Sequence, residues 1–189
     1  DRQITVLDKL VENFQNLRKC FDDTDYSNAV LTYIAIWIDR IAVANTSLGV
    51  WHTGGEKLER IMGRQAIPMT FDYPESQPFC NSSGSALNQL DWILRYFESE
   101  SSNEFPVSFA HSSSGEKAQF DNKSLTAVVT DPPYYDAIAY ADISDFFYVW
   151  LKQTIGEVYP LVFATPKTPK TEECTALKKL VLHENLNAI

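Results

Sequence analysis

The sequence is poor in cysteine, and its few cysteines form no recognisable pattern. Cys20, Cys80 and Cys174 are the only three in 189 residues, and no CxxC pair occurs. Three widely spaced cysteines argue against both a disulfide framework and a zinc ribbon within this chain. Reduced thiols are typical of the cytoplasm, so we expect a cytoplasmic protein that binds no metal.

The sequence also lacks an excess of positive charge. It has 16 Lys and Arg residues against 25 Asp and Glu residues, which gives a net charge of −9. Proteins that bind a nucleic-acid backbone usually present a basic face, because phosphate neutralisation supplies much of the affinity. The composition therefore argues against a free-standing DNA-binding module. It leaves room for a local basic patch, or for DNA contacts made by other parts of a parent protein.

Long apolar runs are missing as well. The opening stretch "DRQITVLDKL" has no signal-peptide core, and no apolar run reaches membrane-spanning length. We therefore expect no membrane partner. The chain begins without Met and ends within a patterned stretch, so it reads as an internal fragment of a longer protein.

Apolar residues at helical spacing dominate the first 100 residues. The spacing predicts helices over 5–21, over 30–41 and over 87–97. Asp25 or Ser27 is the expected N-cap of the second helix, and Ser85 that of the third. A short helix is also predicted over 56–62. Residues 1–100 are thus predicted to be a largely helical region with an interaction or target-recognition role.

The pattern changes in residues 101–189. Residues 105–110 and 125–130 are predicted to be strands, and residues 142–155 a helix. The run "LTAVVT" at 125–130 is apolar throughout, which is typical of a strand buried on both faces of a parallel sheet. This order predicts an α/β fold, with ligands at the carboxyl ends of the strands.

The sequence Asp131-Pro132-Pro133-Tyr134 directly follows the second predicted strand. Such a string can be a simple turn, because Asp and Pro favour turns. It also suits methylation of an exocyclic amine on a nucleobase. A carboxylate and a backbone carbonyl can accept the amine hydrogens, two prolines stiffen the loop, and an aromatic ring can stack on the base.

The motif "DPPY" resembles the catalytic motif of S-adenosylmethionine-dependent amino-methylating DNA methyltransferases. The longer runs "AVVTDPPYYDAIAYADISDFFYVWLK" and "YPLVFATPKTPKTEE" resemble a narrower group within them. These are the large adenine-specific DNA methylases that contain a zinc ribbon and a domain of unknown function. "WHTGGEKLERIMGRQAIPM" and "FDYPESQPF" are similar to that group too, so the resemblance covers roughly residues 30 to 175. It implies that residues 101–189 form part of a Rossmann-like methyltransferase sheet.

The resemblance also implies roles for the four motif residues. Asp131 would accept a hydrogen bond from the target amine, with the carbonyl oxygen of Pro132 as the second acceptor. Pro133 would shape the loop, and Tyr134 would stack on the flipped base.

Three further residues receive roles from the same resemblance. Ser114 would lie near the adenine ring of S-adenosylmethionine, and Asp131 would also face this cofactor. Tyr135 and Asp136 match the group's own extension of the motif and would contact the substrate. Tyr135 could equally be a packing residue.

The chain departs from the family where the cofactor is held. The family's glycine-rich loop is missing, and the only glycine pair, Gly54-Gly55, does not follow a strand that leads into a helix. We therefore expect a fragment of a DNA amino-methyltransferase, with adenine N6 as target, that holds the target-base half of the site and is inactive alone. The alternatives are a non-catalytic binding module derived from such an enzyme, and methylation of RNA or a protein amide.

Overall fold

The computed structural model describes residues 2–59, 61, 70–101, 108–114, 120–134, 138–171 and 173. Within these residues the chain forms four helices and one two-stranded sheet. The elements are α1 (Arg2–Arg18), α2 (Asp25–Ala44), β1 (Val50–His52), β2 (Lys57–Glu59), α3 (Ala86–Glu100) and α4 (Tyr140–Ile155).

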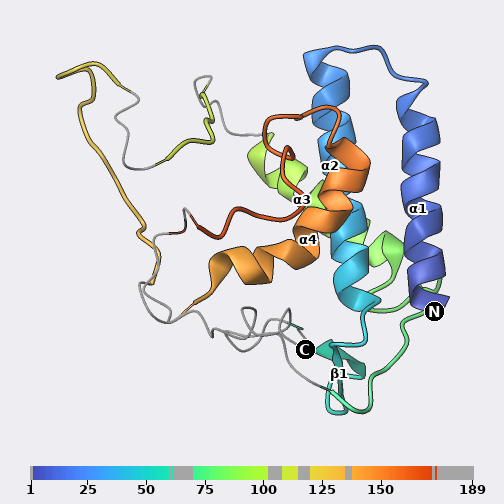
Figure 1. Cartoon of the computed structure of the whole chain (residues 1–189). Helices are drawn as coiled ribbons and strands as arrows, with labels where there is room; N and C mark the ends of the chain where they lie inside the picture. The colour runs from blue at the N-terminus through green and yellow to red at the C-terminus, as the bar shows by residue number, and fades with distance from the viewer. Residues whose placement is uncertain are drawn as a thin grey trace, which may run out of the picture.

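Helix α2 lies at the centre of the helical part and contacts α1, α3 and α4 (Figure 1). The main apolar core joins α1, α2, α4 and the segment after α4. Its buried members are Phe14, Leu31, Ala35, Ile38, Tyr148, Ile155 and Phe163. A second cluster, formed by Leu7, Ile41, Ala42 and Ala86, joins α1 and α2 to the start of α3. The helices predicted over 5–21, 30–41, 87–97 and 142–155 are thus confirmed, and burial of their apolar faces holds them together.

Side-chain caps fix where α2 and α3 begin. Ser85 Oγ accepts a hydrogen bond from the Asn88 backbone at 3.3 Å, as the sequence predicted. The expected cap of α2 was wrong, because Thr24 Oγ1 accepts from the Ser27 backbone at 3.2 Å and Asp25 already lies inside the helix. Either side chain satisfies an amide that the first helical turn leaves unpaired.

The only sheet in the described part of the chain is the hairpin of β1 and β2, which pair antiparallel with Trp51 opposite Leu58. The short helix predicted over 56–62 is therefore wrong within its described residues, since β2 occupies 57–59. Gly54 and Gly55 form the hairpin turn, and the amide of Gly55 donates to the His52 carbonyl at 3.3 Å. A Cβ on Gly55 would lie 2.9 Å from His52 Nδ1, so this tight turn favours glycine.

The predicted Rossmann-like parallel sheet is wrong for the described residues. Residues 125–130 form no strand and are exposed, with Val128 at 72% and Val129 at 97% of full exposure. Residues 108–110, the described part of the other predicted strand, are also irregular and exposed. A strand needs a hydrogen-bonded neighbour, and no described strand lies beside this apolar run. Local β-propensity was therefore a poor guide to the fold here.

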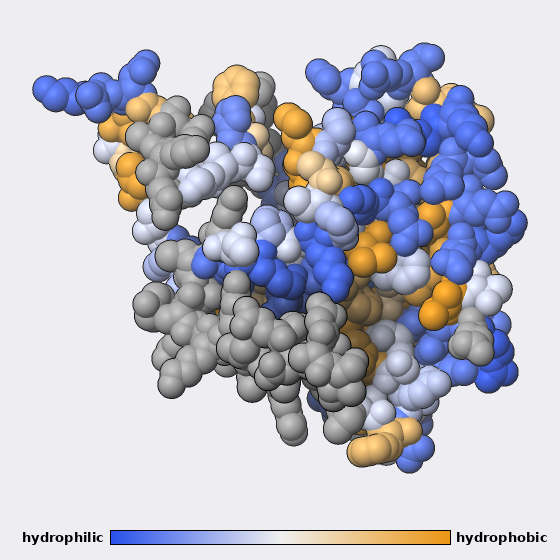
Figure 2. Space-filling view, in the orientation of Figure 1, coloured by the Kyte–Doolittle hydropathy of each residue, from blue (hydrophilic) through white to orange (hydrophobic). Residues whose placement is uncertain are grey.

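Residues 120–134 form an extended segment, hereafter the arm, which stands away from the helical part on the side opposite α1 (Figure 1). Its outer end is hydrophilic, and hydrophobic residues follow directly below it in Figure 2. The outer side of α1 is mostly hydrophilic in the same view, as expected for a helix with one buried face.

Helix α2 is long and apolar enough, by length and composition, to cross a membrane. From the sequence we had expected no apolar run of membrane-spanning length. The core helix of a folded domain passes the same test, and α2 packs against three other helices.

Candidate functional site

The four residues of the DPPY motif lie together at the inner end of the arm. With Tyr140, the first residue of α4, they line an open hollow of about 320 Å³; the lining residues are Asp131, Pro132, Pro133, Tyr134 and Tyr140. All five lining residues are exposed, so the hollow is an open depression on the surface. Tyr140 was not among the predicted site residues, because nothing in its spacing from the motif marks it.

The hollow offers hydrogen-bond acceptors and flat rings to a ligand. The Asp131 side chain is exposed, and Tyr134 is 60% exposed. The backbone amide of Tyr134 donates to the Tyr140 hydroxyl oxygen at 3.4 Å, a long hydrogen bond that links the arm to α4. Each proline fixes its own φ and so limits how the loop can move. A carboxylate, a rigid loop and accessible tyrosine rings can together bind a flat group that carries N–H donors.

The structure does not bring every predicted site residue to this hollow. Ser114 is exposed and is not among the hollow's lining residues. Tyr135 and Asp136 lie outside the described residues, so their predicted roles stay predictions.

No protein-family model, curated protein or solved structure matches this chain. The resemblance to DPPY methyltransferases therefore rests on the residue pattern, and the hollow has to be interpreted from its own chemistry.

The lining residues do not form a site for S-adenosylmethionine. The hollow has one carboxylate, two prolines and two tyrosines, and no glycine turn that could approach the methionine end. The Gly54-Gly55 pair lies in the β1–β2 turn, as the hairpin geometry requires. Among the described residues, no group of three His, Cys, Asp or Glu side chains could hold a metal ion either.

A larger hollow of about 660 Å³ lies between the C-terminal ends of α1 and α4. Its lining carries charges of both signs, and Arg18 of α1 pairs there with Glu157 just beyond α4. Mixed charges on an exposed surface point to no particular class of ligand, and such pairs contribute little to stability.

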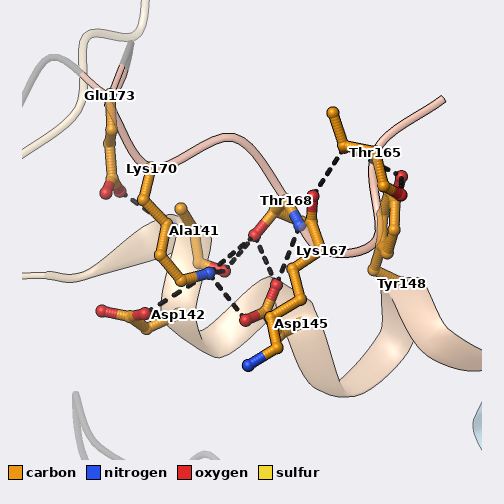
Figure 3. Close-up of polar contacts among 9 residues, drawn as sticks. All are labelled: Ala141, Asp142, Asp145, Tyr148, Thr165, Lys167, Thr168, Lys170 and Glu173. Carbon is orange, nitrogen blue, oxygen red and sulfur yellow. Dashed lines mark hydrogen bonds and ion pairs between the residues drawn. The ribbon is translucent and has the colours of Figure 1, made fainter. Parts of the chain in front are cut away.

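A polar network that the sequence analysis missed lies on α4 (Figure 3). Asp145 is at its centre. Lys170 Nζ lies 2.6 Å from Asp145 Oδ2, and the backbone amide of Thr168 donates to Asp145 Oδ1 at 3.0 Å. Thr168 Oγ1 is 2.6 Å both from Asp145 Oδ1 and from the Ala141 carbonyl oxygen. Lys170 also reaches Asp142 at 3.4 Å.

Asp145 and Lys170 each stabilise the charged form of the other. Burial alone would raise the pKa of Asp145, but the hydrogen bonds from Lys170 and Thr168 lower it below its ordinary value. Burial alone would lower the pKa of Lys170, but its hydrogen bond to Asp145 raises it. Both groups are therefore charged at neutral pH, and the pair attaches the segment after α4 to the helix.

The segment formed by residues 163–171 and 173, hereafter the strap, runs back along α4 towards its N-terminus. The Tyr148 hydroxyl and Lys152 Nζ, in the second half of α4, both donate to the Thr165 carbonyl, at 2.7 and 2.6 Å. At the other end, Glu173 Oε1 accepts from the Ala141 amide at 2.9 Å. The sequence signal for these contacts was weak, because the prolines in "ATPKTPK" indicated only an interrupted tail.

Proposed function

We propose that this chain carries the target-amine half of an S-adenosylmethionine-dependent DNA amino-methyltransferase, with adenine N6 as the target. The observation that supports this most is the hollow, where the DPPY residues present a carboxylate, two prolines and an accessible ring together. The DPPY sequence resemblance adds to it.

The chemistry follows from the poor nucleophilicity of an aromatic amine, whose lone pair is delocalised into the ring. The Asp131 carboxylate and the Pro132 carbonyl accept the two amine hydrogens, which draws the lone pair out of conjugation. Tyr134 stacks on the base after it has left the duplex. Pro133 keeps the acceptors in place, so that little reorganisation is needed when charge develops.

The lining of the hollow does not fit the methyl donor, so on this proposal S-adenosylmethionine is bound outside the hollow. Because the chain has a net charge of −9, we expect most contacts to the DNA backbone to come from other parts of the parent protein. We therefore expect calorimetry to detect little or no binding of S-adenosylmethionine to this chain alone.

The test of Asp131 is methyl transfer to DNA by the full-length protein. We predict that Asp131→Ala lowers kcat by about 100-fold to 1,000-fold, the usual loss when an aligned hydrogen-bonding group is removed from a reacting centre. Asp121→Ala is the matched control, because Asp121 is another exposed carboxylate on the arm and does not line the hollow. Full activity of Asp131→Ala would refute the proposed role.

A non-catalytic binding module is the second candidate, and the poor fit to the cofactor favours it. On this hypothesis the hollow binds a base, and no transfer follows. Tyr134→Ala would then weaken binding of single-stranded DNA, because one stacked base contributes about 1–3 kcal/mol, while Tyr134→Phe would keep it. Exchanging DNA for RNA or a protein in the transfer assay separates the remaining substrate classes.

A further inference from the structure

The first turn of α4 is held by a residue from far along the chain. Ala139, the residue before α4, offers no side-chain cap, so α4 starts without a local acceptor for its free amides. Glu173 supplies one, because its Oε1 accepts from the Ala141 amide at 2.9 Å. A carboxylate at this position also interacts favourably with the positive end of the helix dipole.

The rest of the strap fixes where Glu173 lies (Figure 3). Phe163 is buried against Tyr148, with their ring centroids 5.2 Å apart. Thr168 and Lys170 both bind Asp145, one helical turn beyond Ala141. The strap is thus attached along most of α4, and its last described residue meets the helix N-terminus.

This N-terminus is part of the hollow. Tyr140 is the first residue of α4 and precedes Ala141, whose amide Glu173 binds and whose carbonyl Thr168 approaches. Tyr140 lines the hollow, and its hydroxyl accepts from the Tyr134 amide. A continuous series of contacts therefore joins the strap to the DPPY loop through Ala141 and Tyr140, two adjacent residues of the first turn of α4.

We propose that Glu173 and the Asp145–Lys170 pair are positioning residues, which hold the first turn of α4 so that Tyr140 keeps the DPPY loop in place. Neither Glu173 nor Lys170 lines the hollow, so they act on it through α4. The inference rests on the proposed function only for its effect on methyl transfer. The coupling between the strap and the DPPY loop can be tested without measuring methyl transfer.

The first experiment measures amide resonances and hydrogen exchange by NMR in this chain. Glu173→Ala is expected to speed exchange of the Ala141 amide about tenfold, because a charge-assisted hydrogen bond is lost. It is also expected to shift the amide resonance of Tyr134. Glu157→Gln is the control, because Glu157 forms an exposed ion pair with Arg18 beyond the other end of α4.

The response of the Tyr134 resonance shows whether Glu173 positions the DPPY loop or only caps α4. If the exchange of Ala141 changes while Tyr134 keeps its resonance, Glu173 is only a local cap and the proposal is overturned.

Lys170→Met should shift the Tyr134 resonance in the same direction as Glu173→Ala, and Lys170→Arg should restore the wild-type resonance. If Glu173→Ala does not fold, Glu173→Gln keeps an acceptor oxygen without the charge and should give a smaller shift of the same sign.

The second experiment measures methyl transfer in the full-length protein. Lys170→Met is expected to lower kcat severalfold at unchanged KM for S-adenosylmethionine, and Lys170→Arg to recover it. If the resonances couple but the wild type transfers no methyl group, the proposed function fails and the positioning stands. If the Tyr134 resonance does not respond to the strap variants, the positioning proposal fails, whether or not the protein transfers methyl groups.

Discussion

At the scale of single residues, Asp39 is the most unusual side chain in the described part of the chain. It lies within α2, is only 7% exposed, and its Oδ1 atom has no hydrogen-bond partner. Removal from water disfavours the ionised carboxyl and raises the pKa of Asp39 to about 8. The residue is therefore protonated in the folded protein at neutral pH, and folding takes up a proton.

The raised pKa of Asp39 makes stability depend on pH. The ordinary value is 3.8, so between pH 4 and 8 the unfolded chain is ionised here and the folded chain is not. The free energy of unfolding falls as pH rises through this window, with a slope of up to about 1.4 kcal/mol per pH unit. We predict that Asp39→Asn removes this slope and stabilises the protein at pH 8 by a few kcal/mol.

Urea unfolding followed by circular dichroism at pH 4.5, 6 and 8 measures this effect. Asp22→Asn serves as the control, because Asp22 is exposed in the α1–α2 turn. Parallel pH profiles for wild type and Asp39→Asn would contradict the prediction.

At the scale of elements, the helix boundaries depend on identifiable caps. Ser85 is 1% exposed and caps α3 through the Asn88 amide. We predict that Ser85→Ala lowers the free energy of unfolding by about 1 kcal/mol, because one amide of the first turn loses its acceptor. Guanidinium unfolding measures the change. Ser83→Ala, at an exposed position two residues earlier, should cost much less, and equal losses would show that the cap is not the cause.

The helices could be predicted from sequence because each carries its own periodic pattern. Ile38 of α2 and Ile155 of α4 fall on predicted apolar faces and are buried. Tyr148 was missed, because it is amphipathic and its hydroxyl partner, Thr165, lies outside the helix. Leu87 belongs to the apolar pattern that predicted the helix over 87–97 but is 68% exposed, since spacing alone does not say how wide a buried face is. The strand over 125–130 failed because pairing depends on distant segments.

The candidate site was predictable only in its local part. The four DPPY residues are adjacent in sequence, and the structure places them in one hollow. The contribution of the strap was not predictable, because Glu173 and Ala141 are 32 positions apart and no sequence pattern links them.

At the scale of the whole molecule, the chain divides into a packed helical part and the exposed arm. Phe120 and Leu125 of the arm are 61% and 46% exposed, whereas Phe14 and Phe163 of the core are 2% and 8% exposed. Proteases cleave exposed, extended segments first. We predict that, among cuts at described residues, chymotrypsin cleaves after Phe120 or Leu125 before it cleaves any helix.

Limited proteolysis followed by mass spectrometry identifies the order of cleavage. Phe120→Ser should remove one early cut and leave the cut at Leu125 unchanged. Early cleavage at Phe14 or Phe163 would contradict the packing described for the core.

The shared core has a consequence for synthesis on the ribosome. Its buried residues come from α1, from α2 and from the region around α4, so the two ends of the described chain meet in it. About 96 residues separate the end of α2 from the start of α4. At typical translation rates, α4 is synthesised on the order of 5 to 20 seconds after α2, so the parts of α1 and α2 that pack against α4 lack this contact for that time. During that interval the apolar surface that α4 later covers stays exposed, and this is the stage of folding at which aggregation is most favoured.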